Sequence, residues 1–168
     1  MRDLKKLIIF VGAPGSGKST LTDKIIEEFN GYGVSTDRIK EAIFRKDIDS
    51  DKLGLLFEFQ YFIIEKLMKT GNLIVSDASS SKEWQREKLR EIAKSAGYST
   101  GIIYLYSDIN VLKYRLNRRA TTNQINSKAI DFLEESLVEI EIPNDALIIN
   151  TKLKVEDCMN KIKEWIYD

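Results

Sequence analysis

The sequence predicts an α/β fold in which a five-stranded parallel sheet has helices on both faces. Short apolar runs alternate along the chain with amphipathic segments, which is the pattern of βαβ units. The apolar runs are continuous, as expected for strands that are buried on both faces of a parallel sheet. The chain has 168 residues and shows no repeat, linker or composition shift, so we expect one domain over residues 1–168.

The strands are expected at residues 7–11, 34–36, 73–75, 102–106 and 146–149. Between them, apolar residues recur at helical spacing, as at Leu21 and Ile25. Gly31, Gly71 and Gly97 follow three of these segments and mark their ends. The helices are expected at residues 18–29, 38–46, 53–69, 82–96, 109–117, 127–140 and 154–167, with Ser127 as an N-cap.

Composition excludes several kinds of chemistry. The chain has 26 Lys plus Arg, 26 Asp plus Glu and no histidine, so its formal charge is zero. No overall field would draw it to nucleic acid, and such a contact would need a local basic patch. The lack of histidine excludes Ser-His-Asp and Cys-His pairs and histidine zinc ligands. With Cys158 as the single cysteine, catalysis must use Asp, Glu, Lys, Arg, hydroxyls, backbone amides or a hard cation.

The apolar run at residues 7–11 is far too short for a signal peptide or a membrane span. No other stretch approaches 18 apolar residues. We therefore expect a soluble, cytoplasmic protein without a membrane partner.

A phosphate-binding loop is the strongest motif. Residues 12–20 fit the pattern G-x-x-x-x-G-K-[ST] between a predicted strand and a predicted helix. Its backbone N–H groups would cradle phosphates, and the helix N-terminus would add positive charge. Lys18 would reach the β- and γ-phosphates, and Ser19 would ligate Mg²⁺. A glycine-rich turn without a ligand is the alternative. The nucleotide-binding residues are thus Gly12, Ala13, Pro14, Gly15, Ser16, Gly17, Lys18, Ser19 and Thr20.

Two aspartates follow predicted strands, Asp37 after the second and Asp77 after the third. Ligands of parallel sheets bind beyond the carboxyl ends of the strands, where the phosphate loop also lies. Both carboxylates are therefore expected in the same crevice. The alternatives are that Asp37 only caps the helix that begins at Arg38 and that Asp77 is a turn residue.

The helix at residues 109–117 leads into an arginine-rich segment. Arg115 and Arg119 are one helical turn apart and so share a face. Residues 121–126 are polar and expected to be mobile. The pattern predicts a lid whose arginines neutralise charge during phosphoryl transfer, an effect of about 10³–10⁵ in rate. The alternative is a solvated basic face.

Together these motifs resemble P-loop kinases of the polynucleotide 5′-kinase-like group, which includes zeta-toxin-type kinases. The resemblance covers nearly the whole chain in the same order. It is carried by residues 12–20, 35–39 and 75–79, and by Arg86, Arg115 and Arg119.

The resemblance implies a role for each matching residue. Asp37 would be the general base on the acceptor hydroxyl, and Lys18, Arg115 and Arg119 would act on the donor phosphates. Two positions depart from the family pattern. Lys40 replaces an arginine and cannot form a bidentate clamp, and Ser80 replaces an asparagine. The acceptor-binding residues implied are Asp37, Lys40, Asp77, Ser79 and Arg86, with Arg86 helping to hold that site from the following helix.

The function expected first is transfer of the γ-phosphoryl group of ATP or GTP, with Mg²⁺, to a polynucleotide 5′-OH. The alternative is a small-molecule kinase that acts on a nucleoside monophosphate, sugar, drug or adenylyl sulfate, which the run at residues 143–151 also resembles. A third hypothesis is a regulatory nucleotide-binding ATPase. The sequence shows no clear candidate for the residue that such an ATPase would need to position a catalytic water.

Overall fold

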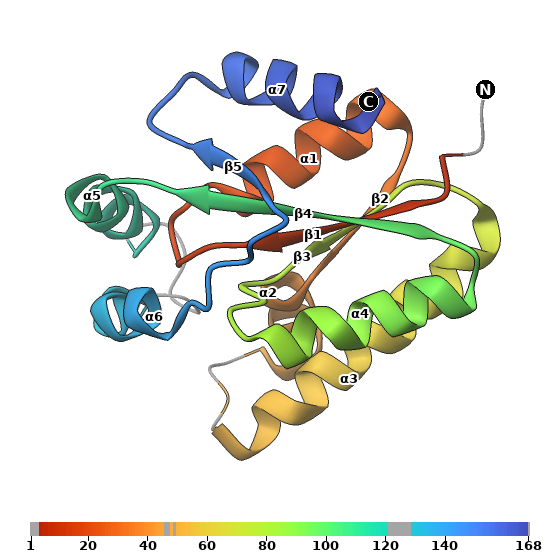
Figure 1. Ribbon diagram of the computed structural model, residues 1–168. Coiled ribbons are helices and arrows are strands. Elements are labelled where there is room, and N and C mark those ends of the chain that lie inside the picture. Colours follow the sequence, from red (N-terminus) through yellow and green to blue (C-terminus); the bar gives the residue numbers. More distant parts are fainter. Residues whose placement is uncertain (1–3, 46–47, 49, 121–128, 168) are drawn as a thin grey trace.

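The sheet is five-stranded and wholly parallel, as the sequence predicts. A computed structural model describes residues 4–45, 48, 50–120 and 129–167. The strand order is β2-β3-β1-β4-β5, with β1 at the centre (Figure 1). The strands are β1 (Lys6–Val11), β2 (Tyr32–Ser35), β3 (Ile74–Asp77), β4 (Ser99–Tyr106) and β5 (Leu147–Asn150).

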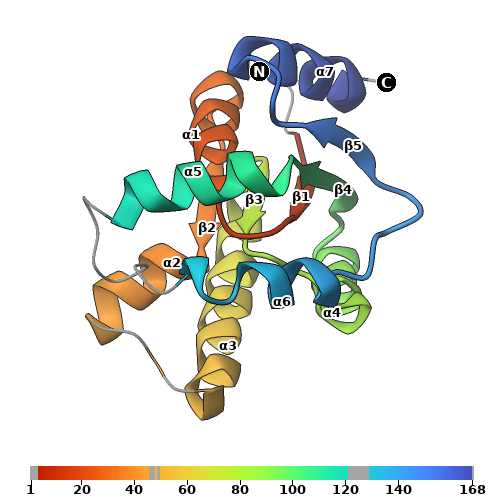
Figure 2. The ribbon, with the colours of Figure 1, turned by 90° about the vertical axis from the view of Figure 1, so that its left-hand side faces the viewer.

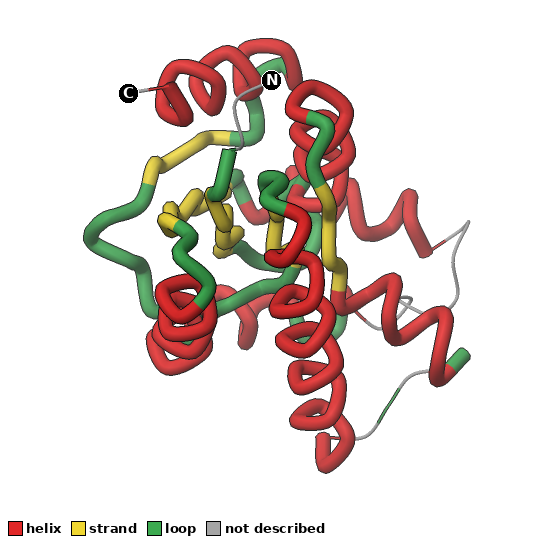
Figure 3. The backbone as a smooth tube through the Cα atoms, turned by 90° about the vertical axis from the view of Figure 1, so that its right-hand side faces the viewer, coloured by secondary structure: helices red, strands yellow, loops and turns green. Residues whose placement is uncertain are grey.

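Helices cover both faces of the sheet and also its carboxyl-end edge. α1 and α7 lie on one face and α3 and α4 on the other, while α5 and α6 cross the edge where the strands end (Figures 1 and 2). The same layers are seen from the opposite edge in Figure 3. The helices are α1 (Lys18–Phe29), α2 (Thr36–Ile39), π-helical η1 (Lys40–Phe44), α3 (Ser50–Leu67), 3₁₀-helical η2 (Met68–Thr70), α4 (Glu83–Ser95), α5 (Ile109–Ala120), α6 (Leu133–Glu139) and α7 (Val155–Tyr167).

The central strand is buried from Leu7 to Val11, because its side chains enter two separate cores. Leu7, Ile9 and Val11 pack into the core under α3 and α4. Ile8 and Phe10 pack into the core under α1 and α7. All five side chains are 0% exposed, which fixes the end of β1 from both faces and thereby the start of the phosphate loop.

A third apolar cluster joins the phosphate loop to α5 and α6. Ala13 of the loop packs with Leu112 and Leu116 of α5 and with Leu133 of α6. The helix that carries the predicted lid arginines is therefore seated directly against the loop.

Two helices differ most from the sequence prediction, whereas α3 and α5 differ only by about three residues at an end. Residues 38–46 do not form one α-helix: α2 begins at Thr36, and π-helical η1 follows and ends at Arg45 with φ 58°. α2 starts early because Ser35 provides the cap, accepting from the Arg38 backbone N–H at 3.4 Å. α6 begins only at Leu133, where acidic residues in its first turn favour a helix N-terminus.

The expected cap Ser127 and the expected mobile segment at residues 121–126 lie outside the described residues. Within the described part of the chain, no helix has the length and apolar character needed to cross a membrane.

Candidate active site

The phosphate loop has a backbone that only small residues allow. Gly15 has φ 79°, in the left-handed region, and a Cβ there would lie 3.2 Å from the Leu112 carbonyl oxygen. A Cβ on Gly12 would lie 2.7 Å from the Leu105 carbonyl oxygen and equally close to Ser16 Oγ. The loop then enters α1, whose first N–H groups have no partners within the helix. This arrangement can receive an anion.

The loop opens onto a cavity of about 810 Å³ at the carboxyl-end edge of the sheet, the edge that faces the viewer in Figure 2. The strand ends, α2, η1, α5 and the segment after β5 all contribute to its walls. The predicted site residues that line it are Pro14, Gly15, Gly17, Lys18, Ser19, Thr20, Asp37, Lys40, Asp77, Ser79, Arg115 and Arg119. Four predicted residues, namely Gly12, Ala13, Ser16 and Arg86, are not among the lining residues.

Lys18 is held inside the loop. Its Nζ donates to the carbonyl oxygens of Gly12 and Ala13 at 2.8 and 3.0 Å. Desolvation lowers the pKa of Lys18, and the charges of Asp77 and Asp37 oppose that shift. The ammonium group is therefore preorganised beside the two carboxylates.

Asp77 is a buried carboxylate beside the phosphate loop. It is 4% exposed, and its Oδ2 has no hydrogen-bond partner among the described residues. Burial raises the pKa of Asp77, while the Lys18 charge and the Ser19 and Ser35 hydroxyls act in the opposite direction. Asp77 thus lies with Lys18 and Ser19 on the loop side of the cavity. An oxygen-binding cation would give the Oδ2 oxygen a partner.

Asp37 lies in the first turn of α2 and is exposed toward the cavity. The hypothesis that Asp37 only caps a helix is wrong, because Ser35 is the N-cap of α2. Arg38, the next residue, is paired with Asp23, because its Nη2 donates to both carboxylate oxygens at 2.7 and 2.9 Å. The Asp37 carboxylate is therefore not needed to start the helix.

The two predicted lid arginines have different surroundings. Arg115 donates to the Gly15 carbonyl oxygen at 3.3 Å, to Thr151 Oγ1 at 3.0 Å and to the Thr151 carbonyl oxygen at 2.5 Å. It joins α5 to the phosphate loop and to the end of β5, so it is not part of a solvated basic face. Arg119 lines the cavity, and its charge lowers the pKa of Lys18. Sequence reasoning did not identify Thr151, which is buried at the end of β5.

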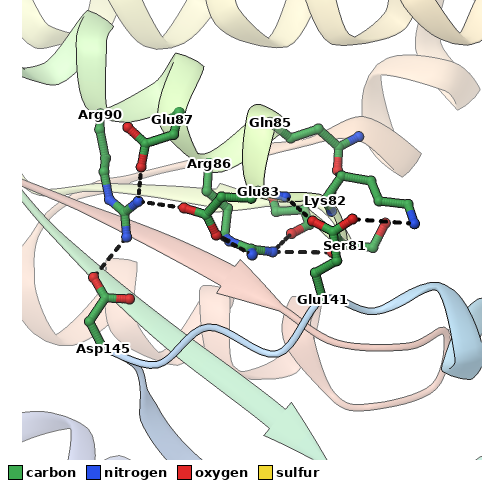
Figure 4. A network of polar contacts seen from close by, with 10 residues as sticks. Ser81, Lys82, Glu83, Gln85, Arg86, Glu87, Arg90, Glu141 and Asp145 are labelled. Carbon is green, nitrogen blue, oxygen red and sulfur yellow. Dashed lines mark hydrogen bonds and ion pairs between the residues drawn. The ribbon is translucent and has the colours of Figure 1, made fainter.

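Arg86 lies behind the cavity. It is 1% exposed and donates to the carbonyl oxygens of Ser80 and Ser81 at 2.8 and 3.1 Å. Its Nε also donates to Glu83 at 3.0 Å, as Figure 4 shows. The structure therefore places Arg86 as a support for the loop after β3 and not among the residues that line the cavity. This place agrees with the family resemblance, which implies that Arg86 helps to hold the acceptor site.

A protein-family model described as an AAA domain (AAA_33) matches residues 7–139. The chain belongs to the AAA_33 family. A shikimate kinase from Clostridium beijerinckii is 26% identical to this AAA_33 chain over 175 residues, covering 98% of this chain and 97% of the relative. An adenylate kinase from Mesomycoplasma hyopneumoniae is 29% identical over 93 residues, which is 55% of this chain and 38% of the relative.

Solved structures share the fold of this AAA_33 chain along its length. A gluconokinase from Sinorhizobium meliloti 1021 has a TM-score of 0.71 at 20% identity, covering 99% of this chain and 94% of its own. An APS kinase from Mycobacterium tuberculosis in complex with AMPPNP and APS has a TM-score of 0.72 at 15% identity, covering 97% and 98%. These likenesses confirm the predicted P-loop kinase fold, and the family and its relatives support a kinase-like phosphotransferase. The finer resemblance to polynucleotide 5′-kinases is not shown by them.

Proposed function

We propose that the protein is an Mg²⁺-dependent kinase that transfers the γ-phosphoryl group of ATP to a hydroxyl group of a small molecule. The observation that carries this proposal is the shared cavity, which collects the phosphate loop, the Ser19–Asp77 side and Asp37 within about 810 Å³. That volume is in the range of about 300–1,000 Å³ that is usual for small-molecule sites. The relatives named as shikimate kinase, gluconokinase and APS kinase support a small acceptor over a polynucleotide.

On the donor side, the phosphate loop and the α1 N-terminus would bind the triphosphate through backbone N–H groups. Lys18 already lies in the loop and would exchange its carbonyl partners for β- and γ-phosphate oxygens. Arg119 would add charge at the cavity wall, and Arg115 would hold α5 in place through Gly15. The AMPPNP complex of the APS kinase supports an adenine nucleotide as the donor.

The residues present fit Mg²⁺. In kinase sites this ion keeps several waters and takes one or two protein oxygens together with phosphate oxygens. Ser19 offers a hydroxyl, and Asp77 offers a buried carboxylate oxygen that lacks a hydrogen-bond partner among the described residues. When bound, the ion would neutralise charge on the β- and γ-phosphates. We therefore place Asp77 with the donor and the metal, and no longer with the acceptor.

On the acceptor side, Asp37 would hold and deprotonate the attacking hydroxyl. The chain has no histidine for this task, and Asp37 faces the cavity from a helix start that Ser35 holds. A base placed in line with the γ-phosphoryl group supplies rate mainly through position.

The acceptor-side wall favours a polyol with little negative charge. Among the described lining residues contributed by α2 and η1, the charged side chains are Asp37 and Lys40. Lys40 provides a point charge, whereas an arginine would form two parallel hydrogen bonds with a phosphate. This wall therefore offers poor compensation for a polyanionic acceptor.

The test is a panel of transfer assays with γ-labelled ATP or GTP and Mg²⁺. The acceptors are shikimate, gluconate, adenylyl sulfate, nucleoside monophosphates and 5′-OH oligonucleotides. We expect label on one small molecule, and none with Lys18→Ala as the matched control. Label only on oligonucleotides would favour the polynucleotide hypothesis. Hydrolysis of ATP without any labelled acceptor would favour a regulatory ATPase, and either result would overturn the proposal.

A further inference from the structure

Polar contacts outside the cavity hold residues 78–82, which we call the acceptor loop. The loop follows β3 and carries Ser79, which lines the cavity. From the phosphate loop, the Gly12 N–H donates to the Ser79 carbonyl oxygen at 3.3 Å. From behind, Arg86 binds the next two carbonyl oxygens, while Ser80 has a left-handed φ of 42°. The shape of this loop therefore depends on contacts from its surroundings.

Glu141, which follows α6, makes a third set of contacts with the acceptor loop and the start of α4. Its backbone N–H donates to the Ser81 carbonyl oxygen at 2.9 Å. Its Oε2 accepts from the Glu83 backbone N–H at 2.7 Å, and its Oε1 lies 3.6 Å from Lys82 Nζ, as Figure 4 shows. Glu83 is the first residue of α4, so its N–H has no partner within the helix. Glu141 thus caps α4 with a favourable negative charge.

Glu141 is also joined to the donor side through α6. Leu133, at the start of α6, packs with Leu112 and Leu116 of α5 and with Ala13 of the phosphate loop. Ile140, the neighbour of Glu141, packs against the same cluster. The acceptor loop is therefore held by the segment after α6, and α6 itself packs against the phosphate loop.

We propose that Glu141 is a positioning residue that keeps Ser79 and the acceptor loop in place for acceptor binding. It touches neither nucleotide nor acceptor, and acts through the N-terminus of α4. Its kinetic readout rests on the proposed function, because that readout requires an acceptor.

The kinetic test compares three variants on the acceptor that the panel identifies. Glu141→Ala should raise the acceptor KM about tenfold, a ratio that corresponds to about 1.4 kcal/mol, within the range for loss of a helix cap. The ATP KM and kcat should stay within about twofold of wild type. Glu141→Gln should restore the acceptor KM, because its amide oxygen can still accept from Glu83.

Asp145→Ala is the matched control. It removes the 2.7 Å contact with Arg90 from the same segment without touching the acceptor loop. Its acceptor KM should equal that of wild type. The proposal is overturned if Glu141→Ala matches Asp145→Ala, or if it lowers kcat, both affinities and thermal stability together.

A second arm needs no acceptor. Hydrogen–deuterium exchange of the peptide that covers residues 78–82 should be faster in Glu141→Ala than in wild type, Asp145→Ala or Glu141→Gln. If wild type phosphorylates no acceptor, the proposed function fails, and this arm still decides the role of Glu141. Equal exchange in Glu141→Ala and Asp145→Ala overturns it. Should Glu141→Ala not fold, Glu141→Leu, which has a side chain of similar size but no acceptor oxygen, replaces it in both arms.

Discussion

Replacing Asp37 by asparagine tests whether its carboxylate is a catalytic base or has only a structural role. The variant keeps the shape of the side chain and its hydrogen-bonding capacity, but it cannot take a proton. Ser35 remains as the N-cap of α2. The structural cost is therefore limited to losing a negative charge in the first turn of the helix, which is worth about 0.3–1 kcal/mol. For a chain of this size, that lowers Tm by at most about 2–4 °C.

The catalytic cost should be far larger. Loss of a general base typically lowers the rate by about 10²–10⁴-fold, which is about 2.7–5.4 kcal/mol of barrier at 1.36 kcal/mol per factor of ten. The assay is kcat at saturating ATP and acceptor, with AMPPNP affinity measured by calorimetry and Tm by thermal melting. We expect kcat to fall in that range while AMPPNP affinity stays unchanged.

Asp23→Asn is the matched control, because Asp23 is also an exposed carboxylate that lines the cavity. Its partner is Arg38, and exposed pairs of this kind contribute about 0–1 kcal/mol. Its kcat should stay close to that of wild type. If Asp37→Asn keeps kcat within about tenfold of wild type, or only lowers Tm, Asp37 is not the base.

Further predictions address the donor side and the acceptor. Burial raises the pKa of Asp77, so its charged form costs stability above that pKa, and the cost shrinks as pH falls from that pKa to the ordinary aspartate pKa. Asp77→Asn should therefore raise Tm at pH 8 more than at a pH near the ordinary aspartate pKa of 3.8, and it should weaken the Mg²⁺ dependence. Thermal melts and Mg²⁺ titrations check this, and an unchanged Mg²⁺ requirement would contradict the metal assignment. Lys18→Ala should abolish transfer without unfolding the chain, and label transfer within about tenfold of wild type would contradict it. Gly15→Ala places a Cβ at φ 79° and 3.2 Å from the Leu112 carbonyl oxygen. This strain costs roughly 1–2 kcal/mol, so the variant should lower Tm by about 2–8 °C. An unchanged Tm would contradict the left-handed conformation of Gly15. The acceptor KM should be nearly flat between low and moderate salt, whereas a steep rise would indicate a polynucleotide.

The sequence predicts well those parts of the site that depend on neighbours in the chain. The phosphate loop follows from a motif between one strand and one helix, and the strand ends place Asp77 beside it. The sequence predicts the second strand and the start of its helix one or two residues too late, because Ser35 and Asp37 are both good caps. The sequence does not reveal that Ser35 accepts from Arg38 and leaves the Asp37 carboxylate to the cavity.

Contacts between distant residues could not be predicted in this way. Helical spacing places Arg115 and Arg119 on one face, but it does not show that Thr151 lies against Arg115. The position of Arg86 on a helix likewise does not show that its guanidinium turns back to the carbonyl oxygens of the acceptor loop. Side chains as long as arginine reach several residues away, so sequence position restricts their partners only weakly.

The two sides of the cavity are thus built differently, and this bears on specificity. Donor contacts come mostly from one continuous segment, the phosphate loop. Phosphate binding requires the residue types that this loop contains. The acceptor loop is held by Gly12, Arg86 and Glu141, which come from three separate parts of the chain. Its shape can therefore change through contacts that never touch the acceptor. Exchanging Lys40 for arginine alone would add a phosphate grip without moving this loop, so we do not expect that exchange by itself to convert the protein to a polynucleotide kinase.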